Sequence, residues 1–342
     1  MGNCCKSSFG RDSTNFMTFA SAQYDHLDKK PSFKLVNSAI PMESKNDDES
    51  VSNLPSHAKR VDNIPDYFTE KTRTALLRVG PYKYQEDDLA IIKEGKDPVA
   101  VELANGIIFI GEWMNGLREG RGKQYWPDGS TYEGYWADDM ANGEGRLIHG
   151  SGDVYEGQFF NDKAHGKGVY IHQDGARYQG NWVENLQHGF GVESWPDGTG
   201  YEGEFQLGKK DGKGKLTLAD GSVYEGEFKG NLIHGIGTYQ WPDGRVYTGQ
   251  WENNRMNGQG VLTWPDGRKY DGGFLDDKKH GYGVFEEADG RKYQGYWKNG
   301  KQHGKGVYIG SDKQEREGEW EHGKRIRWLS TNNSEIVILT QS

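Results

Sequence analysis

The stretch Tyr132-Glu133-Gly134-Tyr135-Trp136 decides the fold, because the chain repeats it at one fixed interval. The same Tyr-x-Gly-x-aromatic pattern recurs every 23 residues, beginning at Tyr155, Tyr178, Tyr201, Tyr224, Tyr247, Tyr270 and Tyr293. Degenerate copies that begin at Phe109 and Arg316 flank the series and bring it to ten units. Self-similarity at a fixed period of this length is the signature of a repeat architecture.

Two further patterns keep the same phase and indicate how each unit folds. A Gly-x-Gly pair follows each of the first nine aromatic stretches, as at Gly143 and Gly145. An Asp-Gly dipeptide ends most units, and in four of them a proline precedes it, as in Pro127-Asp128-Gly129. Proline suits the first central position of a type I turn, and glycine supplies the left-handed residue that closes a short hairpin. Each unit therefore reads as strand, short loop, strand and tight turn.

Strand geometry predicts two different faces. Because successive side chains alternate, Tyr132, Gly134 and Trp136 point to one side, and Gly143 and Gly145 of the partner strand do likewise. Glycine leaves space in a strand where a large ring can lie on the backbone. The other face carries a glutamate or another polar residue at the second position of most units. We therefore expect one aromatic, glycine-lined face and one polar, hydrated face.

These residues resemble the membrane occupation and recognition nexus (MORN) family, whose unit has the form Tyr-x-Gly-x-Trp-x-x-Gly-x-x-His-Gly-x-Gly. The resemblance covers about residues 101–329. It implies an all-β fold, an elongated single-layer antiparallel sheet of about ten 23-residue hairpins with a groove. It implies no catalysis, because arrays of this family serve mainly as interaction and membrane-association modules.

Charge limits the classes of partner. The whole chain carries 42 Lys and Arg against 51 Asp and Glu, a net charge of -9. The repeat block 101–329 contains 28 basic and 35 acidic residues, which leaves it at -7. Nucleic-acid binding favours a basic footprint, so we expect no nucleic acid as partner. The same charge weakens, without removing, the idea that the sheet binds anionic lipid.

The N-terminal sequence Met1-Gly2-Asn3-Cys4-Cys5-Lys6-Ser7 predicts lipidation. Removal of Met1 exposes Gly2, the acceptor for N-myristoylation, although Lys6 stands where Ser or Thr is usual. A single myristoyl chain holds a protein only marginally, so a second signal is expected. Cys4 and Cys5, the only cysteines, are candidates for S-palmitoylation.

The remaining segments are predicted from their composition. Residues 1–64 are polar and predict a disordered, acylated tether. Residues 65–100 are expected to form an N-terminal cap that covers the first sheet edge, with a helix from Tyr67 to about Arg78 capped by Asp66 and ended at Gly80-Pro81. A calmodulin-target helix is the alternative for that segment.

The C-terminal end departs from the repeat pattern, as terminal repeats do. Arg316 replaces tyrosine, and no Gly-x-Gly follows Trp320. Residues 325–329 and 335–339 are expected to form a closing hairpin, so that 330–342 provides a capping strand or tail.

The search for catalytic and cofactor motifs favours structural roles. Five histidines share one register, and their side chains are expected to form hydrogen bonds in loops rather than a metal site: His165, His188, His234, His280 and His303. None of the nine Gly-x-Gly pairs extends into a phosphate-binding motif that leads into a helix. We therefore predict no metal site, no cofactor, no catalytic residues and no enzymatic activity.

The aromatic face is the candidate partner-binding groove. Its candidate residues lie beside the turns or after the Gly-x-Gly pairs: Trp126, Tyr170, Trp195, Tyr239, Trp241, Trp264, Phe285 and Tyr308. In the alternative interpretation, these rings only pack on one another and on glycine.

Together these features predict a non-enzymatic, membrane-tethered scaffold. Acyl chains would hold it at the cytoplasmic face of a membrane, such as the plasma membrane, and the groove would recruit a protein partner there or to a cytoskeletal structure. The alternative is a phosphoinositide-binding module in which the sheet itself contacts lipid headgroups. A homodimer is a further candidate assembly.

Overall fold

The computed structural model describes residues 54–55, 58–84 and 100–329, and most of them belong to an antiparallel sheet of 22 strands. This confirms the predicted all-β class. The strands are β1 Lys59–Arg60, β2 Ala100–Glu102, β3 Ile108–Met114, β4 Leu117–Tyr125, β5 Thr131–Ala137, β6 Met140–Ile148, β7 Val154–Phe160, β8 Lys163–Ile171, β9 Arg177–Val183, β10 Leu186–Ser194, β11 Gly200–Gln206, β12 Lys209–Thr217, β13 Val223–Lys229, β14 Leu232–Gln240, β15 Val246–Glu252, β16 Arg255–Thr263, β17 Lys269–Leu275, β18 Lys278–Glu286, β19 Lys292–Lys298, β20 Lys301–Ile309, β21 Glu315–Glu321 and β22 Lys324–Trp328.

Each of the first nine repeats is a hairpin of one seven-residue and one nine-residue strand, as β5 and β6 illustrate, and the tenth has strands of seven and five residues. Asp138 (φ 49°) and Asp139 (φ 66°) connect them, both left-handed, as a two-residue type I′ turn requires. Consecutive hairpins are joined by a five-residue loop, in which the N–H of Gly129 donates to the carbonyl of Trp126 at 3.0 Å. The Pro-Asp-Gly turn is therefore real, but it lies in the longer of the two connections.

A register shift interrupts every complete hairpin at the same place. In the β5–β6 hairpin Gly134 pairs with Gly145, whereas Trp136, two residues later, pairs with Ala141, four residues earlier. The extra residues form a bulge in which Gly143 takes a left-handed φ of 82°. The expectation that Gly143 lies on the same face as Gly145 is therefore wrong, since the bulge breaks the alternation between them.

The chain divides into two compact units, and the division falls within β12. In the unit that ends at Asp211, each strand from β1 to β11 pairs with its neighbours in sequence. The first sheet edge is extended by β2, which pairs with β3, and by β1, which pairs with β2. β1 lies inside the stretch predicted as a tether. A short 3₁₀ turn, η2 Ala104–Gly106, leads into β3.

In the unit that begins at Gly212, the strands from β12 to β22 also pair consecutively. Here β22 pairs with β21, so Arg325 lies opposite Trp320 in the second strand of the tenth hairpin. The sequence analysis instead predicted that residues 325–329 pair with residues 335–339 in a closing hairpin. Residues 335–339 lie outside the described residues.

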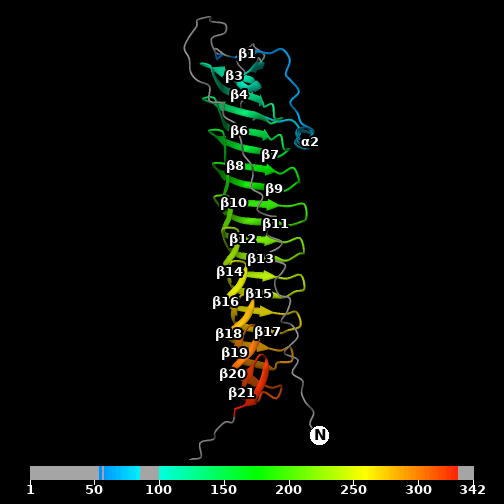
Figure 1. Ribbon diagram of the computed structural model, residues 1–342, viewed down its shortest axis with the longest axis vertical. Helices are drawn as coiled ribbons and strands as arrows, with labels where there is room; N and C mark the ends of the chain where they lie inside the picture. The colour runs from blue at the N-terminus through cyan, green and yellow to red at the C-terminus, as the bar shows by residue number, and fades with distance from the viewer. Residues whose placement is uncertain (1–53, 56–57, 85–99, 330–342) are drawn as a thin grey trace, which may run out of the picture. The chain divides into compact units, whose positions relative to one another are not determined.

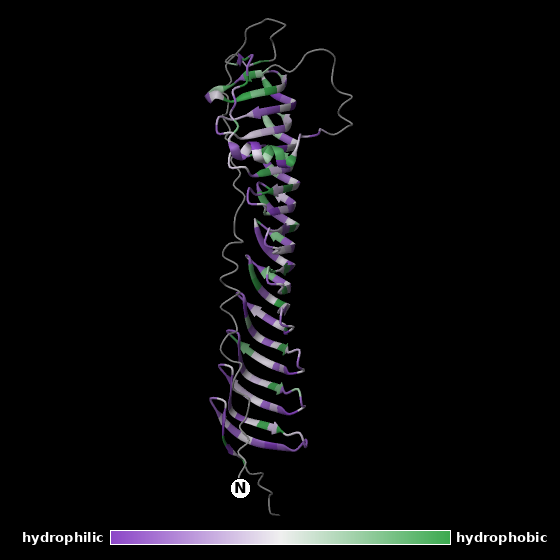
Figure 2. Ribbon diagram, turned by 90° about the vertical axis from the view of Figure 1, so that its right-hand side faces the viewer, coloured by the Kyte–Doolittle hydropathy of each residue, from purple (hydrophilic) through white to green (hydrophobic). Residues whose placement is uncertain are grey.

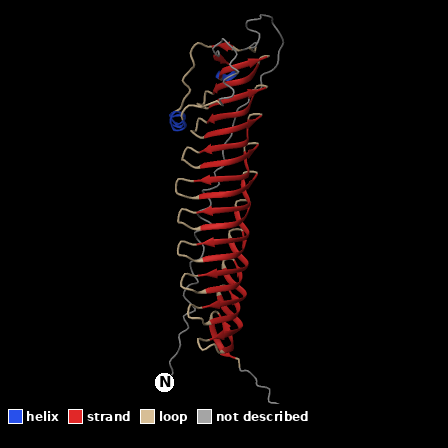
Figure 3. Cartoon of the chain, turned by 180° about the vertical axis from the view of Figure 1, so that it is seen from behind, coloured by secondary structure: helices blue, strands red, loops and turns tan. Residues whose placement is uncertain are grey.

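The helix α2, Glu70–Val79, begins later than predicted and packs elsewhere. Its N-cap is Thr69, whose hydroxyl accepts from the N–H of Thr72 at 3.1 Å, and not Asp66. The helix ends before Gly80 (φ 69°), as the sequence predicts. Figures 1 and 3 show α2 beside the loops on one side of the sheet rather than across its first edge.

Hydrogen bonds to loop carbonyls decide that position of α2. The hydroxyl of Thr72 donates to Gly129 at 3.0 Å, and the hydroxyl of Thr69 donates to Gly150 at 3.1 Å. Ala75 also contributes to a small buried cluster with Ile148 and Val154. The helix therefore links two consecutive loops between hairpins, residues 126–130 and 149–153, through these hydrogen bonds.

Aromatic rings form the core of each unit. In each repeat the first tyrosine meets the aromatic residue four positions later edge to face, as in Tyr247 and Trp251 at 5.1 Å and 88°. Tyr247 also meets Phe274 of the next repeat at 5.0 Å and 80°. The eight repeat tyrosines are at most 3 % exposed. Figure 2 shows polar and apolar residues interleaved along the strands, as expected when successive side chains alternate between a buried and an exposed face.

Candidate interaction surfaces of the repeat sheet

Each core tyrosine is held by its hydroxyl as well as by its ring. In all eight repeats the hydroxyl donates to the carbonyl of the residue three positions later, at 2.8 to 3.1 Å. Burial raises the pKa of these phenols above its ordinary range. They are therefore neutral hydrogen-bond donors at physiological pH.

The aromatic face folds onto itself. Tyr239 pairs with Tyr247, and Trp251 lies four residues farther along the strand, about 13 Å away if the strand were straight. The ring centroids of Tyr239 and Trp251 are nevertheless only 5.9 Å apart. The strand must therefore bend sharply between them, where Gly249 lies. The indole N–H of Trp251 donates to the carbonyl of Gly237 at 3.2 Å and fixes the bend.

A further row of side chains fills the space inside this bend. It consists of the residue that follows the first position of each nine-residue strand: Arg118, Ala141, Ala164, Gln187, Lys210, Ile233, Met256, Lys279 and Gln302. All of these except Lys279 are buried. The cationic members lie on aromatic rings, and Lys210 also pairs with Glu193 at 2.7 Å.

Lys279 lies among four aromatic rings. Its ammonium lies 4.1 Å from the ring centroid of Phe285 and 4.9 Å from that of Trp297. Trp264 and Tyr270 complete the cage, each at 5.1 Å. A cation near several aromatic rings is attracted by each of them. Lys279 therefore links the rings of Tyr270 on β17, Phe285 on β18 and Trp297 on β19.

The eight predicted groove residues fall into two groups that differ in burial. Trp126, Tyr170, Tyr239 and Phe285 are buried, with 4 to 7 % exposure, in contact with neighbouring side chains. The others are half-buried, namely Trp195, Trp241, Trp264 and Tyr308. The contacts agree with the packing interpretation for the first four, while partner binding by any of the eight stays a prediction.

The opposite face carries large apolar side chains that the sequence reasoning missed. Alternation places them beside the glutamates on the outer side of the bend: Phe160, Phe190, Ile236, Tyr282 and Tyr296, which are 50 to 62 % exposed. The expectation of a uniformly polar face is therefore wrong. For Phe190, Ile236, Tyr282 and Tyr296, the available signal was an aromatic or aliphatic residue at a strand position that most other repeats fill with a polar one.

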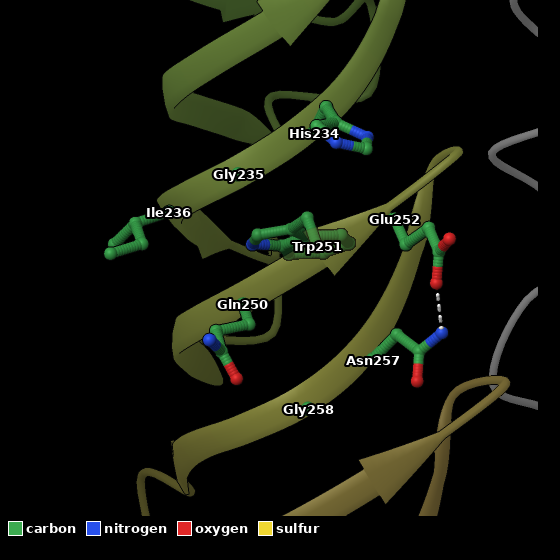
Figure 4. Close-up of a pocket in the computed structure, with 8 residues that line it drawn as sticks. All are labelled: His234, Gly235, Ile236, Gln250, Trp251, Glu252, Asn257 and Gly258. Carbon is green, nitrogen blue, oxygen red and sulfur yellow. Dashed lines mark hydrogen bonds between the residues drawn. The ribbon is translucent and has the colours of Figure 1, made fainter.

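Shallow hollows recur on this outer side at the bulge. One has a volume of about 340 Å³ and is lined by residues including His234, Ile236 and Gln250 (Figure 4). Asn257 closes its rim by donating to Glu252 at 2.6 Å. Another hollow, of about 620 Å³, is lined by the corresponding residues 92 positions earlier in the chain, including Gln158. Since 92 is four repeats, the hollow is a property of the repeat.

The register-sharing histidines line the bulges within the strands and not the loops, which corrects the expected location. Over the part of the chain that the structure describes, no group of three or more His, Cys, Asp or Glu is placed to hold a metal ion. No described helix is long and apolar enough to cross a membrane. The predicted lipidation residues Gly2, Cys4 and Cys5 lie outside the described residues.

Comparison with known families finds one repeat. The family model described as the MORN repeat matches nine segments, 109–131, 132–154, 155–177, 178–200, 201–223, 224–244, 247–267, 270–290 and 293–314. These segments cover more than half of the chain. The tenth unit, which begins at Arg316, lies beyond the last match, although it forms the β21–β22 hairpin. No curated protein shows significant similarity to the chain.

Among solved structures, the chain is similar to the TCP10 domain of Danio rerio CPAP, with 16 % identity, a TM-score of 0.34, and coverage of 60 % of this chain and 96 % of that one. It is also similar to the TCP domain of Drosophila melanogaster SAS-4, solved in complex with a proline-rich motif of Ana2. That match has 15 % identity, a TM-score of 0.29, and coverage of 56 % and 93 %. TM-scores of this size carry no conclusion about function.

Proposed function

Because the chain belongs to the MORN repeat family, a non-enzymatic repeat module, we propose that it is a scaffold that recruits a protein partner to a membrane or a cytoskeletal structure. Acyl chains on Gly2, Cys4 and Cys5 hold it at the cytoplasmic face of that membrane, such as the plasma membrane. The repeats provide the recruiting surface. The scaffold itself carries out no reaction.

The observation that carries the proposal is that each unit exposes large apolar side chains on the otherwise polar outer face of its strands. Ile236 is 62 % exposed and Phe160 is 57 % exposed, although both stand on strands that pair with a neighbour on each side. Contiguous exposed apolar side chains are typical of protein interaction sites, and Tyr282 and Tyr296 are in direct ring contact. Because the inner face is closed, several large apolar side chains that stay accessible on the strands lie on this outer side.

Charge favours acyl chains over the sheet as the source of membrane affinity. Each buried methylene contributes about 0.8 kcal/mol, and two acyl chains suffice for stable anchoring. A repeat block with a net charge of -7 is repelled on average by an anionic leaflet. The phosphoinositide-binding module is therefore the second candidate function.

The decisive experiment is membrane fractionation of the full chain in cells that acylate proteins. Gly2→Ala removes the myristoyl acceptor and is expected to release the protein into the soluble fraction. Cys4→Ser combined with Cys5→Ser is expected to leave only transient binding. Ser7→Ala, which changes no acyl acceptor, is the matched control and should behave as the wild type.

A second arm tests the lipid alternative. Full-length Gly2→Ala protein is mixed with phosphatidylcholine vesicles that contain 5 % phosphatidylinositol 4,5-bisphosphate and is then floated on a density gradient. The proposal predicts that it stays at the bottom. Salt-sensitive flotation, together with normal membrane retention of Gly2→Ala in cells, would overturn the acyl-anchored scaffold in favour of the lipid-binding sheet.

A further inference from the structure

The outer face already holds one extended segment of the chain itself. After α2, residues 81–84 run with Tyr82 and Tyr84 half-buried and with Pro81 and Lys83 exposed, the alternation of an extended strand. The ring of Tyr84 meets that of Tyr135 edge to face at 5.5 Å and 87°. The segment thus presents its tyrosines to the sheet and its lysine to solvent.

Two arginines complete this internal site. The guanidinium of Arg121 lies 5.1 Å from the ring centroid of Tyr84, and that of Arg146 lies 5.5 Å from that of Tyr82. Arg146 also donates to the backbone carbonyl of Gly80 at 2.7 Å. Burial raises the pKa of both segment tyrosines above its ordinary range. Tyr135, Arg121 and Arg146 therefore form a site that binds a Tyr-x-Tyr segment of the same chain.

The repeat presents the same receptor position again, without a covering segment among the described residues. Tyr296 stands seven repeats, or 161 residues, after Tyr135, and Tyr282 stands seven repeats after Arg121. In register, Tyr282 pairs with Tyr296 across β18 and β19, as Arg121 pairs with Tyr135 across β4 and β5. Tyr282 is 50 % and Tyr296 is 55 % exposed.

The pair is arranged to receive a ring. The rings of Tyr282 and Tyr296 lie 5.6 Å apart at 79°, and Gln294 donates to the Tyr282 hydroxyl at 2.7 Å, which fixes that ring. The position of Arg146 is occupied here by the apolar Val307. A segment bound as residues 81–84 are bound would place one aromatic ring against the exposed side of the two tyrosines and a second one over Val307.

We propose that Tyr282 and Tyr296 form a docking site for an extended segment of a partner protein that carries aromatic residues at alternate positions, as in Tyr-x-Tyr. The partner segment lies across β18 and β19 with its intervening residue in solvent. This proposal rests on the scaffold function proposed above and names the surface and the chemistry of the partner.

The test is the binding of a fluorescein-labelled peptide with the sequence of residues 79–85 to the full-length chain, measured by fluorescence anisotropy. Tyr282→Ser with Tyr296→Ser is expected to weaken binding at least tenfold. The matched control is Lys213→Ser with Glu227→Ser, the same two positions three repeats earlier, which should leave binding unchanged. Since all four side chains are exposed, thermal unfolding monitored by circular dichroism should not move in either variant.

Three outcomes would overturn the proposal. In the first, the peptide binds the Tyr282/Tyr296 variant as tightly as the wild type. In the second, Tyr135→Ser abolishes binding and the distal double variant does not, so that the peptide only exchanges with the internal segment. In the third, the unliganded chain forms a dimer that dissociates in a Tyr82→Ser, Tyr84→Ser variant, which makes a second copy the occupant.

These results are separable from the membrane experiment. Loss of peptide binding with intact membrane recruitment removes this docking site and leaves the scaffold function. Loss of recruitment in Gly2→Ala with intact peptide binding supports both proposals. A peptide in which serine replaces both tyrosines should bind neither the wild-type chain nor the Tyr282/Tyr296 variant. That result would show that the two aromatic rings of the peptide provide the binding energy.

Discussion

The hydroxyl of Tyr247 donates a 2.9 Å hydrogen bond to the carbonyl of Gln250, three residues later in its own strand. The ring therefore lies flat over Gly249 and over its partner Gly260. A Cβ at Gly260 would lie 2.4 Å from the Tyr247 ring. Because the arrangement recurs in the other repeats with a tyrosine, a single sheet buries these rings against its own glycines.

Gly260→Ala should destabilise the sheet, because the added methyl group collides with a ring that cannot move away. Overpacking of this kind costs about 1 to 3 kcal/mol. Urea unfolding monitored by circular dichroism measures the change. The control is Gly200→Ala, where the nearest atom to a new Cβ is the Glu193 carbonyl oxygen at 3.5 Å. An equal loss in both variants would contradict the proposed role of the ring.

Alkaline pH should unfold the sheet cooperatively. Burial raises the pKa of Tyr247 and the equivalent tyrosines in the folded state, whereas unfolded tyrosines ionise near pH 10. The unfolded chain then releases protons that the folded chain retains, so the tyrosines' contribution to stability is constant below about pH 10 and falls above it. Tyrosinate absorbance at 295 nm should rise together with the loss of the β-sheet dichroism signal. Ionisation of the core tyrosines with the sheet intact would refute this prediction.

Asp277→Asn should stabilise the protein at neutral pH. Burial raises the pKa of this turn carboxyl to about 6, above its unfolded value near 3.8, so the folded state disfavours the charged form. The penalty is absent below about pH 4, grows between pH 4 and 6, and is complete above 6. Asparagine keeps the hydrogen bond from the N–H of Met256, as Asn254 does for Ile233 at 2.7 Å.

The shift of about two pKa units corresponds to about 3 kcal/mol, at about 1.4 kcal/mol per unit, and solvent screening of the half-buried carboxyl reduces it. We therefore expect a gain of about 1 to 2 kcal/mol for Asp277→Asn at pH 7 and little change at pH 3.5. Thermal unfolding at both pH values provides the measurement. Asp276→Asn, in the adjacent turn position, is the control, because its carboxylate pairs with exposed Arg255 at 2.9 Å. A gain that is independent of pH would count against the burial argument.

Lys279→Ala should loosen its hairpin by about 1 to 2 kcal/mol, because the ammonium contacts four rings and the aliphatic stem fills the bend. Lys279→Met should lose less, since methionine fills the same position as fully buried Met256 in the preceding repeat. Tryptophan emission and urea midpoints check both variants. Lys278→Ala, at an exposed neighbouring position, should change neither.

Thr72→Val should release α2 from the loops. The buried hydroxyl donates to Gly129, and valine of similar shape leaves that carbonyl without its donor, at a cost of about 1 to 3 kcal/mol. Hydrogen exchange should accelerate across residues 70–79. Thr74→Val, at an exposed helix position, is the matched control. Unchanged protection of α2 in Thr72→Val would show that the loop contacts do not hold the helix.

The sequence by itself determined the repeat and its chemistry. The 23-residue period fixed the number of hairpins, and the alternation in Tyr132-Glu133-Gly134-Tyr135-Trp136 determined which side chains share a face, because strand geometry is local. The left-handed glycine of each Pro-Asp-Gly turn was predictable for the same reason. The end of α2 at Gly80 was also encoded locally.

Only the tertiary structure decided which face stays accessible. The bulge at Gly143 and the bend at Gly249 depend on pairing between strands, so no single strand reveals that the aromatic side closes on Lys279 and its neighbours. The N-cap at Thr69 likewise depends on loop carbonyls far away in sequence, such as that of Gly150. Burial is a sum over neighbours that the fold brings together, and for that reason Tyr282 and Tyr296 emerge as surface only when the strands are assembled.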